Sequence, residues 1–148
     1  MENIFIHEFG KLKLDKDGII SHDDLPFVHE GTIELFKKNI VQESNKYFIK
    51  VGENKAEIEV EDVYLWVETL EVFPETSTVI LHLTNDKNIE ISKDTQLYLE
   101  NSYLYYIDDN LRVKFNRKTY NEIMTYLVQP YEDYLLKVGS LKLQIVKK

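Results

Sequence analysis

Apolar and polar residues alternate along much of the chain, and this period changes in two segments. Residues 11–14 read Lys-Leu-Lys-Leu and lead into a turn at residues 15–18 that ends in Asp-Gly, which predicts a β-hairpin. From residue 30 the apolar positions instead recur with the spacing of a helix of about three turns. They are Ile33, Phe36, Ile40 and Val41. Two strands are predicted next, at residues 47–51 and 56–60.

The same order of elements returns in the second half of the chain. A hairpin is predicted at residues 103–107 and 111–115, a helix at 119–128, and two strands at 134–138 and 141–146. Pro130 is expected to end this helix, because proline cannot continue a helix interior. The segment between the halves, residues 63–99, is strand-like throughout.

The repetition also holds residue by residue. Thr32 to Lys55 falls on Thr119 to Lys142 at an offset of 87 positions, and eight of the 24 aligned residues are identical. We therefore predict an α+β fold of two repeated hairpin–helix–hairpin units with mostly antiparallel sheet. Residues 1–72 form the N-terminal lobe and residues 73–148 the C-terminal lobe, packed together without a linker. Interfaces between such lobes are favoured ligand sites.

Composition narrows the functional classes. A net charge of −8 argues against binding duplex nucleic acid, but it does not exclude one small nucleotide. The chain has no cysteine, which removes disulfides, thiol catalysis and cysteine-based zinc sites. No apolar run approaches the roughly 18 residues that span a membrane, and a cytoplasmic location is the default expectation.

Motifs for catalysis or metal binding are weak. Asp15 to Asp24 resembles a calcium loop, but Lys13 falls on the first ligand position, so a hairpin turn is the favoured interpretation. The four histidines lack a metal-ligand spacing, and the chain has neither a nucleophile elbow nor a phosphate-binding glycine loop. We therefore predict no catalytic residue, no cofactor and no metal. Asp17 and Glu61 are carboxylates that could still meet in space.

Residues 112–118 are the one dense basic stretch, and they hold both arginines of the chain, Arg112 and Arg117. Strand alternation places Arg112 and Lys114 on the outer face, and Asn116 is a good N-cap for the second helix. This stretch is either an anion site or plain surface charge. The single tryptophan, Trp66, and ten tyrosines either stack on a base or pack in the core.

An ordered set of short motifs runs from about Lys11 to Tyr126. The motifs are Asp17-Gly18 with His22, Leu35-Phe36, Val60-Glu61-Asp62, Thr84-Asn85, and Asn116-Arg117 followed by Glu122. This order resembles the bacterial family of domain of unknown function 1285 (DUF1285). The resemblance implies a duplicated α+β protein that is not an enzyme, with a C-terminal half similar to pleckstrin-homology-like domains. It also implies a nucleotide-like ligand between the halves and a role in signalling.

The chain departs from the family pattern at three places: Ser21 where an aromatic residue is expected, Asp23-Asp24 where a glycine is expected, and His29 where an arginine is expected. The loss of this arginine weakens the case for a doubly charged phosphate ligand.

We predict a ligand site formed by His22, His29, Asn85, Asn116 and Arg117. His29 and Asn116 coincide at the offset of 87, so both helix starts are expected to face one cleft. Arg117 is the expected anion anchor, and His29 is an expected donor. The alternative is a protein-interaction module that acts through sheet edges or dimerisation. An enzyme is the least favoured interpretation.

Overall fold

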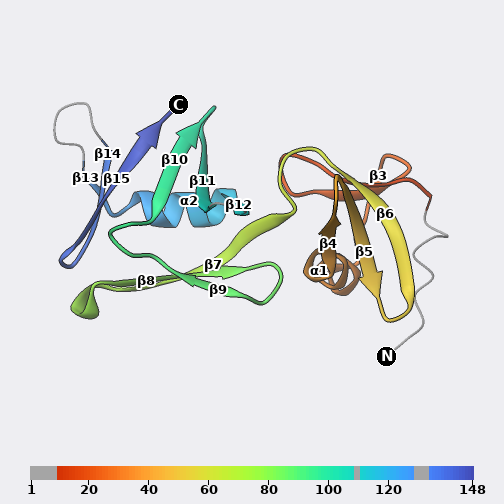
Figure 1. Ribbon diagram of the computed structural model, residues 1–148, viewed down its shortest axis with the longest axis horizontal. Coiled ribbons are helices and arrows are strands. Elements are labelled where there is room, and N and C mark those ends of the chain that lie inside the picture. The colour runs from red at the N-terminus through yellow and green to blue at the C-terminus, as the bar shows by residue number, and fades with distance from the viewer. Residues whose placement is uncertain (1–9, 109–110, 129–133) are drawn as a thin grey trace. The chain divides into compact units, whose positions relative to one another are not determined.

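The computed structural model describes residues 10–108, 111–128 and 134–148, and it has an α+β fold (Figure 1). Within these residues the chain is mostly β-sheet, with two α-helices. It divides into two compact units, residues 1–64 (unit 1) and residues 65–148 (unit 2). The boundary predicted between residues 72 and 73 lies inside strand β7 (Leu65–Phe73). In the structure, unit 1 ends at Tyr64 and unit 2 begins at Leu65. No helix among the described residues is long and apolar enough to cross a membrane.

Unit 1 contains one six-stranded sheet in the order β3-β2-β1-β6-β5-β4. Its elements are β1 (Leu12–Leu14), β2 (Ile20–His22), β3 (Leu25–Pro26), α1 (Glu30–Lys38), β4 (Ile40–Glu43), β5 (Lys46–Val51) and β6 (Asn54–Val60). Strand β1 runs parallel to β6, and the other described pairings of this sheet are antiparallel.

The first predicted hairpin is confirmed. Strands β1 and β2 are antiparallel, and the turn between them is fixed by the side chain of Asp15. Its Oδ1 accepts hydrogen bonds of 2.9 Å from the backbone N–H groups of Asp17 and Ile19. This carboxylate oxygen is therefore used within the turn, as the hairpin interpretation requires.

The first helix is shorter than the sequence pattern predicts. It ends at Lys38, because the N–H of Asn39 bonds to the carbonyl of Phe36 and the Asn39 side chain donates to the carbonyl of Leu35. Ile40 and Val41 then form strand β4, which pairs with β5. Phe36 is fully buried and joins the core of unit 1. The other buried members of this core are Leu12, Leu14, Ile20, Ile40, Ile49, Val51 and Ile58.

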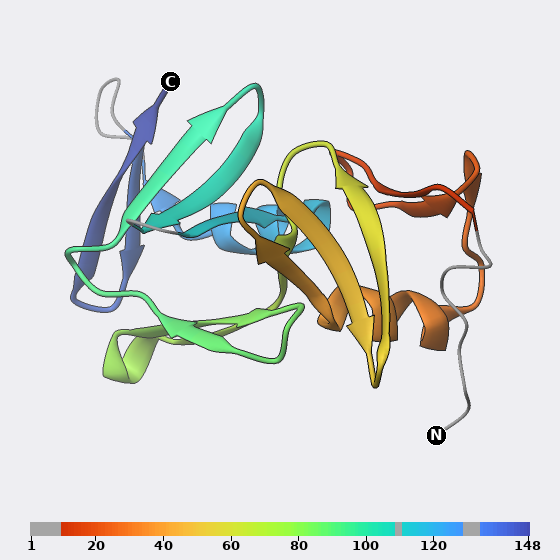
Figure 2. The same ribbon diagram turned by 45° about the vertical axis from the view of Figure 1, so that its right-hand side comes forward.

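Unit 2 contains one nine-stranded sheet in the order β13-β14-β15-β10-β11-β12-β7-β8-β9. After β7 come the 3-10 turn η2 (Pro74–Thr76), β8 (Thr78–Leu83), β9 (Asn88–Glu90), β10 (Gln96–Glu100), β11 (Tyr103–Asp108), β12 (Leu111–Phe115), α2 (Arg117–Met124), β13 (Leu127–Val128), β14 (Tyr134–Val138) and β15 (Leu141–Lys147). Helix α2 packs against β7 and β12 (Figure 2). The described parallel pairs are β10 with β15 and β12 with β7.

The second helix is also shorter than predicted. It ends at Met124, and Leu127 and Val128 form a short strand rather than a last helical turn. The predicted stop at Pro130 lies outside the described residues. In both helices the apolar spacing continues past the true end into the next strand. Ile40 of β4 is buried opposite Ile49, whereas Leu127 of β13 is half-buried and Val128 is exposed.

The two units share backbone features at the sequence offset of 87. Helix α1 begins at Glu30 and helix α2 at Arg117. Gly52 and Gly139 occupy the hairpin turns that follow, with φ of +60° and +57°. The cross-strand pairs beside these turns also correspond: Lys50 with Lys55, and Lys137 with Lys142. Residues 87 positions apart therefore occupy equivalent helix starts, turns and cross-strand pairs in the two units.

His82 on β8 provides a testable pH dependence in unit 2. Its Nε2 lies 3.0 Å from Oε2 of Glu71, and its Nδ1 lies 2.6 Å from Oδ1 of Asn88. The hydrogen bond to Glu71, and then that to Asn88, raises the pKa of His82 above 6.5. The stabilisation is therefore complete below about pH 6.5 and is lost as the pH rises through the folded-state pKa.

We expect Glu71→Gln to lower the pKa of His82, because the substitution removes the partner's charge. An NMR titration of the imidazole measures this pKa directly. An unchanged pKa in the variant would show that Glu71 does not cause the shift.

Candidate functional site

Strand register places four large side chains in one row across unit 2. Tyr98 of β10 lies opposite Tyr105 of β11, which lies opposite Lys114 of β12, and Lys114 lies opposite Trp66 of β7. Residues that are directly opposite share one face of a sheet, so the four side chains are neighbours. All four are buried, with at most 5% of their surface exposed.

Lys114 is enclosed by aromatic rings. Its Nζ lies 3.7 Å from the ring centroid of Tyr103, 5.1 Å from that of Trp66 and 5.6 Å from that of Tyr105. Burying an ammonium group is costly, and cation–π contacts of about 0.5–2 kcal/mol each offset part of the cost. The indole Nε1 of Trp66 is buried and has no hydrogen-bond partner among the described residues.

Arg112 lies two residues before Lys114 on the same strand, and several groups fix its guanidinium. Its Nε donates a 2.7 Å hydrogen bond to the hydroxyl of Tyr98, and Nη2 lies 3.3 Å from a carboxylate oxygen of Glu100. The guanidinium also lies 4.2 Å from the ring centroid of Tyr105, which stacks on Tyr98 with 5.1 Å between centroids. Arg112 therefore has a defined orientation.

Two of the predicted site residues extend this arrangement. Asn116 caps α2, since its Oδ1 accepts a 2.8 Å hydrogen bond from the N–H of Thr119. Arg117 begins the helix, is exposed, and lies 4.9 Å from the ring centroid of Tyr120 and 5.6 Å from that of Tyr103.

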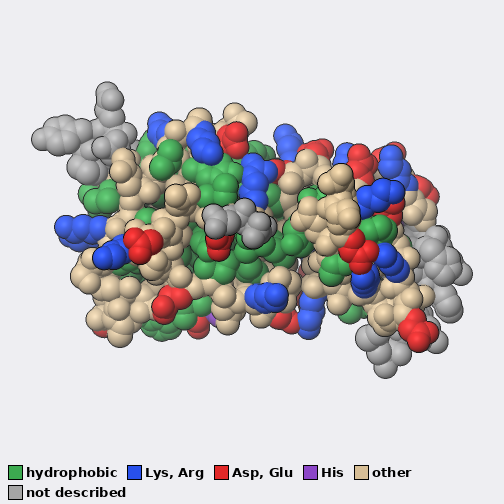
Figure 3. Space-filling model, viewed as in Figure 1, with side chains coloured by type: hydrophobic (Ala, Val, Ile, Leu, Met, Phe, Trp, Pro, Cys, Tyr) green, Lys and Arg blue, Asp and Glu red, His purple; other side chains and the backbone are tan. Residues whose placement is uncertain are grey.

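We call this set the cation–aromatic cluster: Trp66, Tyr98, Tyr103, Tyr105, Arg112, Lys114, Arg117 and Tyr120. In Figure 3, lysine and arginine side chains stand beside hydrophobic side chains, a class that includes tyrosine, on the face of unit 2 that is in view.

His29 lies in unit 1 and caps helix α1. Its Nδ1 accepts a 3.1 Å hydrogen bond from the N–H of Thr32, so a neutral imidazole carries its proton on Nε2. The expected donor role therefore falls on Nε2. The capping pairs His29–Thr32 and Asn116–Thr119 correspond at the offset of 87.

The other two predicted residues have local contacts. The ring of His22 lies 4.5 Å from that of Phe27, at the end of β2. Asn85 lies in the turn between β8 and β9, where its Oδ1 accepts a 3.1 Å hydrogen bond from the N–H of Lys87. Of the five predicted residues, the cluster includes Arg117, and Asn116 lies directly before it in the chain as the cap of α2. His22 and His29 belong to unit 1, and Asn85 lies in the β8–β9 turn of unit 2.

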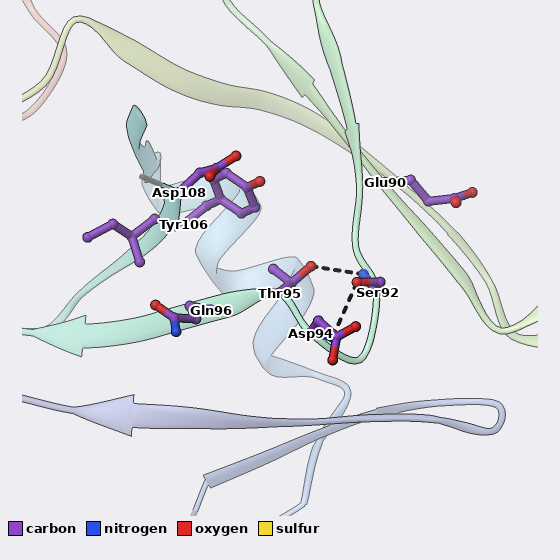
Figure 4. A pocket seen from close by; sticks show the side chains of 8 residues that line it. Glu90, Ser92, Asp94, Thr95, Gln96, Tyr106 and Asp108 are labelled. Carbon is purple, nitrogen blue, oxygen red and sulfur yellow. Dashed lines mark hydrogen bonds between the residues drawn. The ribbon is translucent and has the colours of Figure 1, made fainter. Parts of the chain in front are cut away.

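A cavity of about 510 Å³ opens elsewhere in unit 2 (Figure 4). Its lining residues are Glu90, Ser92, Asp94, Thr95, Gln96, Tyr106, Ile107 and Asp108. Burial, followed by the charge and hydrogen bond of Asp108, raises the pKa of Tyr106 above 10.0. Three carboxylates and a neutral phenol make this cavity unfavourable for an anion. Among the described residues, no group of three histidine or acidic side chains is placed to hold a metal ion.

No family model and no curated protein matches the sequence. Solved structures do match. A crystal structure of a DUF1285 family protein from Silicibacter pomeroyi superposes with a TM-score of 0.62 at 13% sequence identity, covering 93% of this chain and 79% of that chain. The chain shares the DUF1285 fold. A second DUF1285 family protein, from Shewanella baltica, gives a TM-score of 0.52 at 16% identity, covering 80% of this chain and 93% of that one. The resemblance predicted from the sequence is thereby confirmed at the level of the fold.

On this DUF1285 fold, one expectation about the basic stretch is wrong. Lys114 was expected on an outer face, but only 1% of it is exposed. Strand alternation correctly predicts that Lys114 points to the other face of the sheet from the core residues Val113 and Phe115. That face is also buried, because large aromatic rings cover it. The tyrosines of β10 and β11 were missed as site residues. The predicted turn at residues 108–110 would place Tyr105 opposite Val113, whereas the register of the structure places it opposite Lys114.

Proposed function

We propose that the chain is a DUF1285 family member and a non-enzymatic binding module. Its ligand is an anionic small molecule with a planar ring, as a nucleotide has, and it binds at the cation–aromatic cluster of unit 2. One observation supports this most strongly: both arginines of the chain lie against tyrosine rings in one cluster, beside a buried lysine.

The chemistry of the cluster suits such a ligand. Aromatic side chains stack on bases, and a guanidinium binds a phosphate or carboxylate with two parallel hydrogen bonds. Arg117 is the exposed guanidinium, and the rings of Tyr103 and Tyr120 orient it before a ligand arrives. A chain of net charge −8 repels anions in general, so binding depends on this local concentration of positive charge.

The finer architecture is part of the proposal. The matching caps, turn glycines and strand registers at the offset of 87 support a duplicated hairpin–helix–hairpin unit. The pleckstrin-homology-like character of the C-terminal half, a ligand between the halves, a signalling role and a cytoplasmic location stay predictions from the sequence.

A protein-interaction module that adds strands at sheet edges has weaker support. The outermost strands of the described sheets are β3, β4, β9 and β13, and they contain two, four, three and two residues. Strands this short offer few unpaired backbone groups to another chain.

Replacing Arg117 by alanine is expected to weaken nucleotide binding about ten- to a hundredfold. This range corresponds to about 1.5–3 kcal/mol for hydrogen bonds to a charged group. A thermal-shift screen of nucleotides, dinucleotides and cyclic nucleotides identifies the ligand, and calorimetry measures the affinity. Lys118→Ala is the matched control, since Lys118 is the next exposed cation on α2. Equal affinities of Arg117→Ala and the unmodified protein would exclude Arg117 as the anchor.

A further inference from the structure

The hairpin of β5 and β6 in unit 1 holds a carboxylate between two lysines. Lys50 and Lys55 lie opposite each other, and both ammonium groups bind Glu43 of β4, with Lys55 Nζ at 2.6 Å from Oε1. These two hydrogen bonds lower the pKa of Glu43 below 4.5. This cross-strand lysine pair therefore binds an oxyanion within the same chain.

Unit 2 repeats the lysine pair without its carboxylate. Lys137 and Lys142 lie opposite each other in the same register as Lys50 and Lys55. The residue 87 positions after Glu43 is Pro130, which has no charge to offer. Within the described part of the chain, neither Lys137 nor Lys142 has an ion-pair partner.

Three further glutamates of unit 1 also have no acidic counterpart in unit 2. In unit 1, Glu57, Glu59 and Glu61 pair with Lys46, Lys11 and Lys13. The residues at the offset of 87 are Gln144, Val146 and Lys148. The β14–β15 hairpin therefore retains the pair Lys50 and Lys55 as Lys137 and Lys142, without the counterpart of Glu43. The lysines that pair with the other three glutamates are not retained, because Lys11, Lys13 and Lys46 fall on Tyr98, Glu100 and Asp133.

A cavity of about 470 Å³ adjoins Lys142. It is lined by Ser77, Lys93, Ser140, Leu141 and Lys142. The N–H of Ser140 donates a 2.7 Å hydrogen bond to Oγ of Ser77, and the two hydroxyl oxygens lie 2.8 Å apart. These contacts join the β14–β15 turn to the chain just after η2, and Figures 1 and 2 show the two turns side by side. The cavity thus has a defined wall beside two exposed ammonium groups.

We propose that this cavity is an anion site for a phosphate group, with Lys93 and Lys142 as its cationic ligands and Ser140 as a hydroxyl ligand. Lys137 adds positive charge from the neighbouring strand. A phosphate dianion carries two negative charges and can neutralise two ammonium groups, whereas a carboxylate carries one. Hydrogen bonds between an ammonium group and a phosphate oxygen are charge-assisted and therefore stronger than hydrogen bonds between neutral groups. This site is separate from the cation–aromatic cluster and does not depend on the proposed function.

The test is a titration of the full chain with inorganic phosphate at constant ionic strength, followed by amide NMR. We expect saturable shifts at Ser140 and Leu141, and about tenfold weaker binding in Lys142→Gln and in Lys93→Gln. Lys55→Gln is the matched control, because its lysine already binds Glu43 and its loss should leave phosphate affinity unchanged. Arg117→Ala should likewise have no effect, which separates this site from the cluster.

Vesicles that contain phosphatidic acid form a second arm. Vesicle binding that Lys142→Gln abolishes assigns the phosphate to a lipid headgroup, whereas binding of inorganic phosphate alone assigns it to a free phosphate. The proposal is overturned if neither probe shifts Ser140 and Leu141. It is also overturned if Lys142→Gln and Lys55→Gln weaken binding to the same extent.

Discussion

Replacing Phe36 by alanine is expected to lower the free energy of unfolding by about 3–5 kcal/mol. Phe36 is fully buried and is the one buried residue of α1. Its ring also makes an edge contact with Phe27, with 5.4 Å between centroids. The substitution leaves a cavity between α1 and the sheet of unit 1, which removes the main apolar contact of the helix. Urea denaturation followed by circular dichroism measures the loss.

Phe73→Ala is the control for this substitution, because 42% of Phe73 is exposed. It removes the same number of atoms from a site that already contacts water, so a cost below about 1 kcal/mol is expected. Equal losses for the two variants would contradict the placement of Phe36 in the core.

Replacing Gly139 by alanine is expected to cost about 2–5 kcal/mol. Its φ of +57° disfavours any side chain, and a Cβ there would lie 2.3 Å from the carbonyl oxygen of Pro74 and 2.5 Å from Oγ of Ser77. The backbone conformation accounts for about 1–2 kcal/mol, and the steric conflict adds about 1–3 kcal/mol. Chemical denaturation measures the sum.

Gly52→Ala separates these two causes. Gly52 has a φ of +60°, and a Cβ there would meet no atom within 4 Å. The cost at Gly52 should therefore be that of the backbone conformation alone, about 1–2 kcal/mol. If the β14–β15 turn packs against the segment after η2, Gly139→Ala must lower the free energy of unfolding more than Gly52→Ala does. Identical costs would contradict that contact.

Local patterns predicted most strands of the fold. Alternation and turn residues are properties of neighbouring positions, so the Asp-Gly hairpin and the strands at residues 47–51 and 111–115 are confirmed. Both helix ends were predicted too late, because the apolar residues of β4 and β13 continue the helical spacing. Whether Ile40 extends a helix or begins a strand depends on its pairing with Ile49, which no local pattern contains.

The site was predictable only in part. Asn116 as an N-cap follows from its position before a helix, and Arg117 then follows as the first helical residue. The burial of Lys114 could not be predicted in the same way. It depends on rings of the hairpin partner β11 together with the ring of Trp66 on β7, and only the strand order brings β7 beside β12.

The cluster can be tested directly, because Trp66 is the single tryptophan of the chain and lies in the same cross-strand row as Lys114. A titration of tryptophan fluorescence with the nucleotide that gives the largest thermal shift reports binding beside this residue. We expect a saturable change whose midpoint moves to about ten- to a hundredfold higher concentration in Arg117→Ala and is unchanged in Lys118→Ala. The same midpoint in all three proteins, or no fluorescence change with any nucleotide of the screen, would contradict ligand binding at the cation–aromatic cluster.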